Sequence, residues 1–388
     1  IHEMSDADLE QRLRQRLLKN KYLIVLDDVW DVEVWNVLER SLPDDGNGSR
    51  IMITSRLRKV ALEAEPDRDP HSLRLLNDDE SWKLLQMKIF QEEGCCPEEL
   101  VDIGEQIAER CGGLPLAVVA VAGILEKTEK ELERWELIAK ELNSLVIGDA
   151  ETRCKDILQL SYSHLPAHLK ACFLYFGAFQ GEKDVRVSKL IQLWIAEGFV
   201  QKKEPRSLEE TAEEYLLDLI DRSLVIISKK RSKGGVKACR IHDLLRDLCQ
   251  SQSSEDKFLQ LVTRYDEPYA SLLDSDHWVD FDSYYPSNPV KYESHRLCIC
   301  LKRKVFVDSR PSGPRTRSLI FSASSDTYPR RPYNLSFIPR HFKLVKVLDL
   351  ECINIGHSFP TEMEFLVQLR YLAISGDMGS IPRSISNL

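Results

Sequence analysis

The chain has 388 residues, 43% of them hydrophobic, and its 53 Lys and Arg are outweighed by 62 Asp and Glu, for a formal net charge of −9. This length suits two to four domains with buried cores, and the acidic balance argues against a surface that coats nucleic acid or anionic membrane throughout. No apolar run approaches the roughly 18–20 residues that span a bilayer, and the ten cysteines show no CxxC pair that would indicate a zinc ribbon.

The first part of the chain alternates between helix and strand patterns. Leucines at helical spacing among charges indicate an amphipathic helix at 6–19. An unbroken apolar run at 22–26, and a second run of the same form at 50–56, are typical of parallel strands covered by helices on both faces, and a short helix at 34–38 is expected between them. Strand, helix and strand in that order predict a βαβ crossover in an α/β sheet.

Two acidic residues, Asp27 and Asp28, directly follow the first of these strands. In open α/β sheets ligands bind beyond the carboxyl ends of the strands. P-loop NTPases use a carboxylate at such a position to hold the magnesium of a bound nucleotide. The pair is therefore a candidate metal and nucleotide site, although a strand that ends in an acidic turn would give the same pattern.

Residues 78–250 have a mainly helical pattern, interrupted by a Gly-Gly-Leu-Pro-Leu segment at 112–116. Near its end, two short apolar strands at 224–227 and 236–240 flank a turn rich in Lys, Arg and Gly, which predicts a hairpin with a basic tip. Helices followed by such a hairpin suggest a winged-helix module. The helices are expected at 78–90, 95–110, 117–125, 155–162, 166–175, 187–197 and 207–221.

Beyond residue 250 the composition changes and a repeat begins. Residues 251–290 carry eight acidic and two basic side chains and are expected to be a linker. Four apolar positions then recur with an offset of 24 residues. Leucine-rich repeats have periods of about 20–29 residues, and their short strands line a concave surface. The recurring pairs are Phe342 and Leu366, Val345 and Leu369, Leu348 and Leu372, and Leu350 and Ile374.

Five motifs follow one another in an order that resembles the NB-ARC region of plant intracellular immune receptors, the nucleotide-binding leucine-rich-repeat (NLR) class. The resemblance covers residues from about 20 to 250 together with the repeats. The fourth motif, and the Trp after the acidic pair, are similar to the coiled-coil subclass rather than the TIR subclass. The motifs are LIVLDDVW at 23–30, GSRIMITSR at 48–56, CGGLPLA at 111–117, CFLYFGAF at 172–179 and IHDL at 241–244.

This resemblance implies a multidomain α/β and α fold. Its parts would be a partial P-loop NTPase sheet, a helical domain, a winged-helix domain and the start of a leucine-rich-repeat solenoid. The expected boundaries are 1–77 for the nucleotide-binding α/β part, 78–150 for the helical (ARC1) domain, 151–250 for the winged-helix (ARC2) domain, 251–290 for the acidic linker and 291–388 for the repeats.

The resemblance also implies a role for each matched position around ADP or ATP. Asp27 would hold Mg²⁺ through water, and Asp28 would be the catalytic residue that orients or activates the attacking water. Arg56 would sense the γ-phosphate, because a fixed guanidinium distinguishes ATP from ADP by one phosphate group. Pro115 would pack against adenine, where it leaves no N–H donor unsatisfied, and Leu116 is assigned to the same pocket.

Two further residues are expected to act as a switch. His242 would reach the β-phosphate of ADP from the winged-helix domain and lock the closed state. Asp243 would sit in the first turn of the following helix, where its charge suits the helix dipole, and would aim His242. Without the other motifs, an arginine such as Arg56 would more often be an exposed surface charge, and a histidine such as His242 would more often only start a helix. These assignments therefore depend on the ordered set of motifs.

One departure from the family pattern is large. The chain contains no Gly-x-x-x-x-Gly-Lys-Ser/Thr phosphate loop and no coiled-coil domain, so it is expected to be a fragment of a longer receptor that binds nucleotide weakly or not at all. A smaller departure is Ile241, where the family most often has Met.

The leading interpretation is a disease resistance switch that alternates between ADP and ATP, not a metabolic enzyme, with at most slow ATPase activity. Its expected partners are its own repeat and coiled-coil domains, a pathogen effector, a guarded host protein or another NLR, with oligomerisation on activation. It is expected in the cytoplasm, with plasma-membrane association when activated. The alternatives are a winged-helix DNA-binding regulator that uses the basic run 229–233, and a P-loop kinase.

Overall fold

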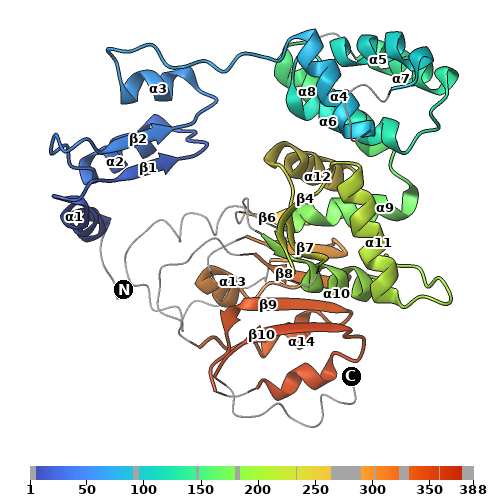
Figure 1. Ribbon diagram of the computed structural model, residues 1–388. Coiled ribbons are helices and arrows are strands. Elements are labelled where there is room, and N and C mark those ends of the chain that lie inside the picture. The colour runs from blue at the N-terminus through green and yellow to red at the C-terminus, as the bar shows by residue number, and fades with distance from the viewer. Residues whose placement is uncertain are drawn as a thin grey trace. The chain divides into compact units, whose positions relative to one another are not determined.

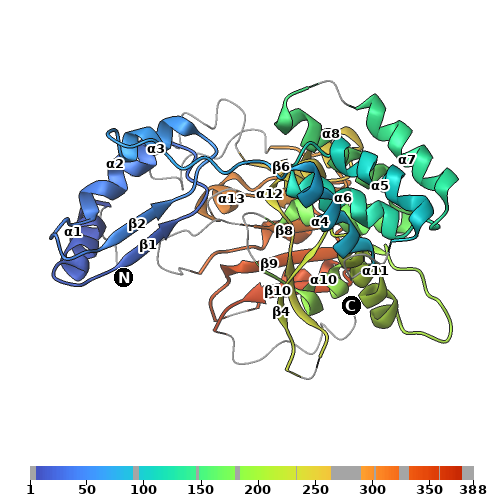
Figure 2. The same cartoon turned by 45° about the horizontal axis from the view of Figure 1, so that its top comes forward.

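The computed structural model describes residues 6–90, 96–145, 148–179, 184–232, 234–263, 290–300, 303–322, 332–357 and 359–377. The chain divides after Arg74 into two compact units, which are described separately (Figures 1 and 2). Among the helices of the described residues, none has the length and apolar character needed to cross a bilayer.

The first unit is a small α/β layer. Its two strands pair in parallel, with Leu23 opposite Arg50 and Leu26 opposite Ile53, so the predicted βαβ crossover is confirmed. The connecting helix begins after Asp31, whose carboxylate accepts the Glu33 N–H at 3.0 Å as an N-cap. The elements are α1 (Asp6–Leu17), β1 (Leu23–Leu26), α2 (Val32–Ser41), β2 (Arg50–Ile53) and α3 (Arg58–Ala64).

The second unit opens with five helices that gather in one bundle (Figures 1 and 2). The third of them, α6, is apolar on nearly all sides and its residues from Ala117 to Leu125 are mostly buried. Gly123 lets this helix approach the chain at Arg222, where a Cβ would lie 2.1 Å from the Arg222 carbonyl oxygen. The five are α4 (Asp78–Phe90), α5 (Glu98–Arg110), α6 (Pro115–Glu126), α7 (Leu132–Ser144) and α8 (Ala150–Ser163).

Shorter helices and a three-stranded antiparallel sheet follow. The predicted hairpin is confirmed as β4 and β5, and a short strand that the sequence did not predict, β3, pairs with β5 to give the order β3-β5-β4. A capping box between Ser207 and Glu210 starts α11. The elements are α9 (Ala167–Leu174), the 3₁₀ helix η1 (Tyr175–Ala178), β3 (Val185–Arg186), α10 (Val187–Glu197), α11 (Leu208–Asp221), β4 (Ile226–Lys230), β5 (Val236–Arg240) and α12 (Asp243–Glu255).

A five-stranded parallel sheet with the order β10-β9-β8-β7-β6 completes the second unit. The offset of 24 residues found in the sequence is the register of its last two strands, in which Leu348 lies opposite Leu372 and Leu350 opposite Ile374. The elements are β6 (Gln260–Val262), β7 (Arg296–Ile299), α13 (Arg303–Ser309), β8 (Ser318–Phe321), α14 (Phe337–His341), β9 (Val347–Asn354), the 3₁₀ helix η3 (Thr361–Phe365) and β10 (Tyr371–Ser375).

The acidic segment at 251–290, expected to be a linker, begins as regular structure. Residues 251–255 complete α12, and β6 at 260–262 pairs in parallel with β7, which extends the sheet backward past its expected start at 291. The alternation of apolar residues is too short there to stand out from the acidic composition. The rest of the segment, 264–289, lies outside the described residues.

Helix α10 lies against strands β9 and β10, and one continuous core joins the hairpin region to the sheet through Cys298, Ile320 and Val347. Charged contacts accompany the apolar ones. Lys189 of α10 lies 2.6 Å from Asp349 and 2.9 Å from Glu351 of β9, and the Asp349 side chain is only 3% exposed.

Two further ion pairs and two cation–ring contacts lie at this interface. Arg186 pairs with Glu351 at 2.5 Å. At the other end of α10, the Arg296 Nε of β7 lies 2.8 Å from a Glu197 oxygen. The Arg296 guanidinium is sandwiched by aromatic rings, 4.4 Å from the centroid of Phe258 and 4.9 Å from that of Phe199. The charges of α10 are thus matched at both ends by the sheet.

Candidate functional site

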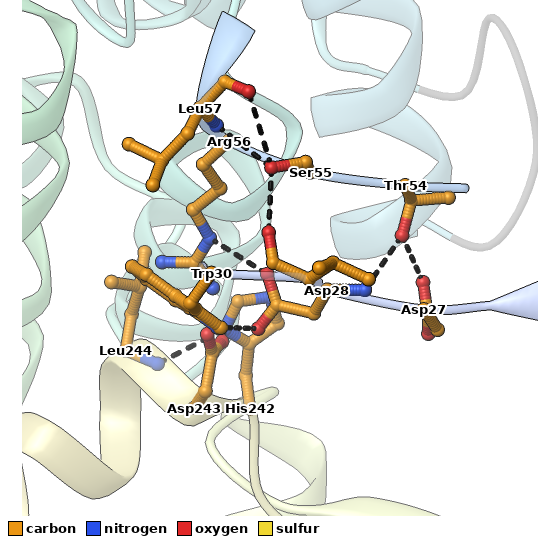
Figure 3. Close-up of polar contacts among 11 residues, drawn as sticks. Asp27, Asp28, Trp30, Thr54, Ser55, Arg56, Leu57, His242, Asp243 and Leu244 are labelled. Carbon is orange, nitrogen blue, oxygen red and sulfur yellow. Dashed lines mark hydrogen bonds and ion pairs between the residues drawn. The ribbon is translucent and has the colours of Figure 1, made fainter. Parts of the chain in front are cut away.

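Asp27 and Asp28 lie at the carboxyl end of β1, where the threonine directly after the neighbouring strand β2 links them (Figure 3). The Thr54 hydroxyl donates a hydrogen bond to Asp27 Oδ1 and accepts the Asp28 N–H at 2.8 Å. The backbone continues this pairing, with the Thr54 N–H bonded to the Leu26 carbonyl at 2.9 Å. Asp28 has a φ of 54°, a left-handed conformation that aspartate tolerates better than most residues. Thr54 therefore orients the Asp27 carboxylate and holds the backbone of Asp28.

Asp28 and Arg56 are held together by a tryptophan (Figure 3). The Trp30 indole N–H donates to Asp28 Oδ2 at 2.7 Å, and Arg56 Nε lies 3.5 Å from Asp28 Oδ1. The Arg56 guanidinium also stacks over the Trp30 ring, 4.6 Å from its centroid. An ion pair exposed to this degree, 39% and 38% for the two side chains, adds little stability, so its main effect is to fix where the guanidinium lies.

Two hydroxyl residues of this cluster were not singled out from the sequence. Besides Thr54, Ser55 donates to the Val29 carbonyl at 2.6 Å and accepts the Leu57 N–H at 3.0 Å, which ties the loops after both strands together. Their position directly after the second strand and before Arg56 is the signal that could have identified them, because the carboxyl ends of parallel strands meet at one edge.

Pro115 and Leu116 begin α6 directly after a sharp turn. Gly112 and Gly113 have φ values of 63° and 71°, which favour glycine. A Cβ on Gly113 would lie 2.3 Å from the Leu76 carbonyl oxygen, and the Leu76 N–H bonds the Gly113 carbonyl at 2.9 Å. Pro115 occupies the first helical turn and is exposed, while Leu116 is half-buried. The turn thus presents an apolar ring where no backbone donor needs a partner.

His242 and Asp243 form the start of α12 (Figure 3). His242 is the N-cap, and its Nδ1 accepts the Leu244 N–H at 3.2 Å while lying 2.5 Å from Asp243 Oδ1. The Asp243 side chain is 10% exposed and that of His242 is 39% exposed. A neutral Nδ1 can cap the helix and a protonated one can donate to Asp243, and both arrangements fix the ring at the helix start.

The side chains at the end of β1 are suitable ligands for Mg²⁺, the metal ion expected with a bound nucleotide. Magnesium in nucleotide sites usually takes one or two carboxylates, with phosphate and water oxygens as its other ligands. Asp27 offers such a carboxylate, oriented by Thr54. Among the described residues no group of three or more His, Cys, Asp or Glu gathers as a metal cage. The donor set therefore suits a cation held chiefly by phosphates.

The structure brings together Asp27, Asp28 and Arg56 in the first unit. The other predicted site residues belong to the second unit, where Pro115 and Leu116 begin α6 and His242 and Asp243 begin α12.

Comparisons with known proteins identify two domains in this chain. Residues 1–95 match the NB-ARC domain and residues 179–249 match the disease resistance protein winged helix domain. The chain is 41% identical over 392 residues to the putative late blight resistance protein homolog R1B-16 of Solanum demissum, and the match covers 100% of this chain but 28% of that protein. Its identity to the homolog R1B-14 from the same plant is 40% over 386 residues, covering 99% and 27% of the two chains. The chain thus spans less than a third of the length of these relatives.

The match to the NB-ARC domain defines the class, a nucleotide-binding module that generally binds ADP or ATP and has at most weak ATPase activity. Within that class, the chain carries both an NB-ARC match and a disease resistance winged helix match, and it is similar along its whole length to plant late blight resistance homologues. The predicted P-loop-type α/β sheet and winged helix are confirmed.

Proposed function

We propose that this chain is part of a plant NLR immune receptor of the coiled-coil subclass, whose exchange of ADP for ATP releases effector-triggered defence and hypersensitive cell death. The observation that carries the proposal is the cluster of Asp27, Asp28 and Arg56 at the ends of two parallel strands. Identity to late blight resistance homologues along the whole chain supports the same conclusion.

In the proposed site, Asp27 holds Mg²⁺ through water and Asp28 orients the water that attacks the γ-phosphate. Bound magnesium neutralises phosphate charge. Arg56, fixed by Asp28 and Trp30, reads the presence of the γ-phosphate. Pro115 and Leu116 contact adenine from the start of α6. Intact receptors of this kind would hydrolyse ATP slowly, as a timer rather than as a metabolic enzyme.

His242 and Asp243 are proposed to form the lock of the ADP state. The Leu244 N–H and Asp243 fix the His242 ring at Nδ1, and this orientation supports the proposed contact with the β-phosphate. Asp243, buried beside it, holds the ring in that orientation.

The proposed layout keeps the boundaries 1–77, 78–150, 151–250, 251–290 and 291–388, with the last segment starting a leucine-rich-repeat solenoid. What supports the solenoid is the parallel register at an offset of 24 residues between β9 and β10. The proposed partners are the receptor's own repeat and coiled-coil domains, an effector, a guarded host protein or a second NLR, with oligomerisation on activation. The proposed site of action is the cytoplasm, with plasma-membrane association on activation.

The DNA-binding alternative is not favoured. Two cations of the basic hairpin already have acidic partners, since Lys229 lies 2.8 Å from Asp184 and Arg231 lies 3.8 Å from Glu213. Partnered cations of this kind are poorly suited to releasing counterions from DNA phosphates.

The function is tested by the nucleotide preference of the complete receptor. Arg56→Ala is expected to weaken ATP binding by about 10- to 100-fold, since a hydrogen bond to a charged group contributes about 1.5–3 kcal/mol, while ADP binding changes little. Isothermal titration with each nucleotide measures both. The matched control is Arg58→Ala, which removes an exposed arginine paired with Asp69 at 3.1 Å. Equal losses for ATP and ADP would contradict a γ-phosphate sensor.

Asp243→Val in the complete receptor is expected to release the closed state and cause cell death without a pathogen. If the closed state is favoured over the open state by only a few kcal/mol, the loss of one contact changes their populations strongly, because each 1.4 kcal/mol is about tenfold in population. Transient expression in leaves measures cell death, and the bound nucleotide is identified after denaturation. Glu255→Val, at the other end of α12, is the control. A silent Asp243→Val receptor that keeps its ADP would place the lock elsewhere.

A further inference from the structure

Two cysteines lie side by side where β7 ends. Cys298 and Cys300 are two residues apart on the extended chain and so point to the same face of the sheet. Their sulfur atoms are 3.7 Å apart. Cys298 is fully buried, whereas Cys300 is partly buried, so only the second is within reach of a small molecule from solvent.

The buried sulfur also joins two parts of the second unit. Cys298 Sγ donates a hydrogen bond to the carbonyl oxygen of Ala178 at 3.1 Å. Ala178 is the last residue of η1, which precedes the antiparallel sheet, whereas Cys298 lies in the parallel sheet. The protonated thiol of Cys298 is therefore one of the contacts between these two parts.

We propose that Cys298 and Cys300 form a redox site, in which a hydroperoxide oxidises the two thiols to a reversible intrachain disulfide. In the first step the Cys300 sulfur attacks the peroxide, the O–O bond breaks, and Cys300 becomes a sulfenic acid as one molecule of water or alcohol leaves. In the second step the Cys298 sulfur attacks the Cys300 sulfur and displaces water. The dithiol loses two electrons and two protons, and the peroxide is reduced.

The 3.7 Å between the sulfur atoms brings the two side chains close to bonding distance. Two residues of strand advance the chain by about 6.6 Å, at the upper end of the usual range of about 4.4–6.8 Å for the Cα atoms of a disulfide, so closing the bond requires the backbone to shift where β7 ends. Because the separation is near the upper limit, the disulfide would be readily reduced, and such disulfides are the regulatory ones.

The surroundings also set the order of the two steps. The neighbouring Cys300 thiol, together with burial, raises the pKa of Cys298 well above its ordinary value. Cys298 thus stays protonated and inert toward peroxide. Cys298 meets no oxidant from solvent, and it reacts only with the oxidised sulfur of Cys300, which lies 3.7 Å away.

Disulfide formation would remove a hydrogen bond that Cys298 makes to η1. Once oxidised, Cys298 has no S–H to donate, and the Ala178 carbonyl loses its 3.1 Å partner in a buried place. A buried carbonyl without a donor is unfavourable. The oxidised protein should therefore hold η1 less firmly against the parallel sheet than the reduced protein does.

Mass spectrometry of the purified 388-residue protein tests the proposal. Trypsin releases residues 297–302 as one peptide, which contains both cysteines and no other. After hydrogen peroxide and then iodoacetamide, this peptide is expected to carry no alkyl group and to be lighter by two hydrogens. Dithiothreitol should restore two alkylation sites. Hydrogen exchange of residues 175–178 should be faster in the oxidised protein.

Two controls separate this site from general oxidation. Cys300→Ser should leave Cys298 alkylated once and unresponsive to peroxide, because the group that meets the oxidant is gone. The exposed Cys352 should be oxidised without forming an internal bond. A peptide 297–302 that keeps both alkyl groups, or that gains oxygen at Cys300 while Cys298 stays alkylated, would overturn the proposal and leave the pair as ordinary buried thiols.

Discussion

Lys189→Met is expected to destabilise the second unit by about 3–5 kcal/mol, because removal of one partner leaves a buried charge uncompensated. The charge left behind is that of Asp349, whose side chain is 3% exposed and 2.6 Å from the lysine. Glu351 would keep Arg186 as its partner. Urea unfolding followed by the fluorescence of the buried Trp194 measures the loss, since Trp194 lies on the same helix.

The double variant Lys189→Met/Asp349→Leu separates the charge from the packing. Replacement of both members by apolar residues of similar size is often neutral or stabilising, so this variant should recover most of the loss. Lys202→Met, which removes an exposed pair with Glu204 at 3.1 Å, should change stability by less than about 1 kcal/mol. A Lys189→Met protein as stable as the parent would mean that the pair is solvated.

The same pair predicts a dependence on alkaline pH. Burial lowers the pKa of Lys189, but the pairing with Asp349 and Glu351 outweighs it and leaves the pKa above its ordinary value of 10.5. A raised pKa means that the pair's stabilisation is fully present below pH 10.5 and is lost as the pH rises through the folded value. The parent should therefore lose more stability in strong alkali than the double variant does.

Gly123→Ala is expected to cost about 3 kcal/mol, the upper end of what overpacking a core costs. Inside a helix this change would normally stabilise by about 1 kcal/mol. Here the new Cβ would lie 2.1, 2.5 and 2.8 Å from backbone atoms of Arg222, which cannot rotate away as a side chain can. Thermal and urea unfolding of the 388-residue protein measure the change.

Gly104→Ala on α5 is the matched control. Its Cβ would meet ring atoms of Trp82 at 2.4 and 2.5 Å, but a ring at the edge of a core can shift, so the cost should be clearly smaller. If Gly123→Ala were neutral or stabilising, the close approach of α6 to Arg222 would be refuted. Because α6 begins at Pro115, the same contact fixes the proposed adenine-binding turn relative to α11.

Features with a local sequence signature were predictable. The parallel strands β1 and β2 follow from short apolar runs, and the register of β9 with β10 follows from the offset between Leu348 and Leu372. His242 at the start of α12 follows from its place between a hairpin and an amphipathic segment. In each case the sequence pattern that allows the prediction lies within the element or directly beside it.

Contacts that depend on distant parts of the chain were not predictable. Nothing near Lys189 in the sequence points to Asp349, and nothing near Arg296 points to Glu197. Likewise the link from Thr54 to both aspartates depends on which two strands are neighbours. Strand β6 was missed because three residues are too few to show alternation.

The contact between α10 and β9 has a consequence for the synthesis of the protein. About 150 residues separate Glu197, at the end of α10, from Val347, at the start of β9. A ribosome that adds about 5–20 residues per second needs roughly 8–30 s to make that stretch. During this time Trp194 and its neighbours have emerged, but the strands that complete their core have not. Nascent chains should therefore need a chaperone that shields this helix until the sheet arrives, and a messenger RNA that slows translation between these points should increase misfolding.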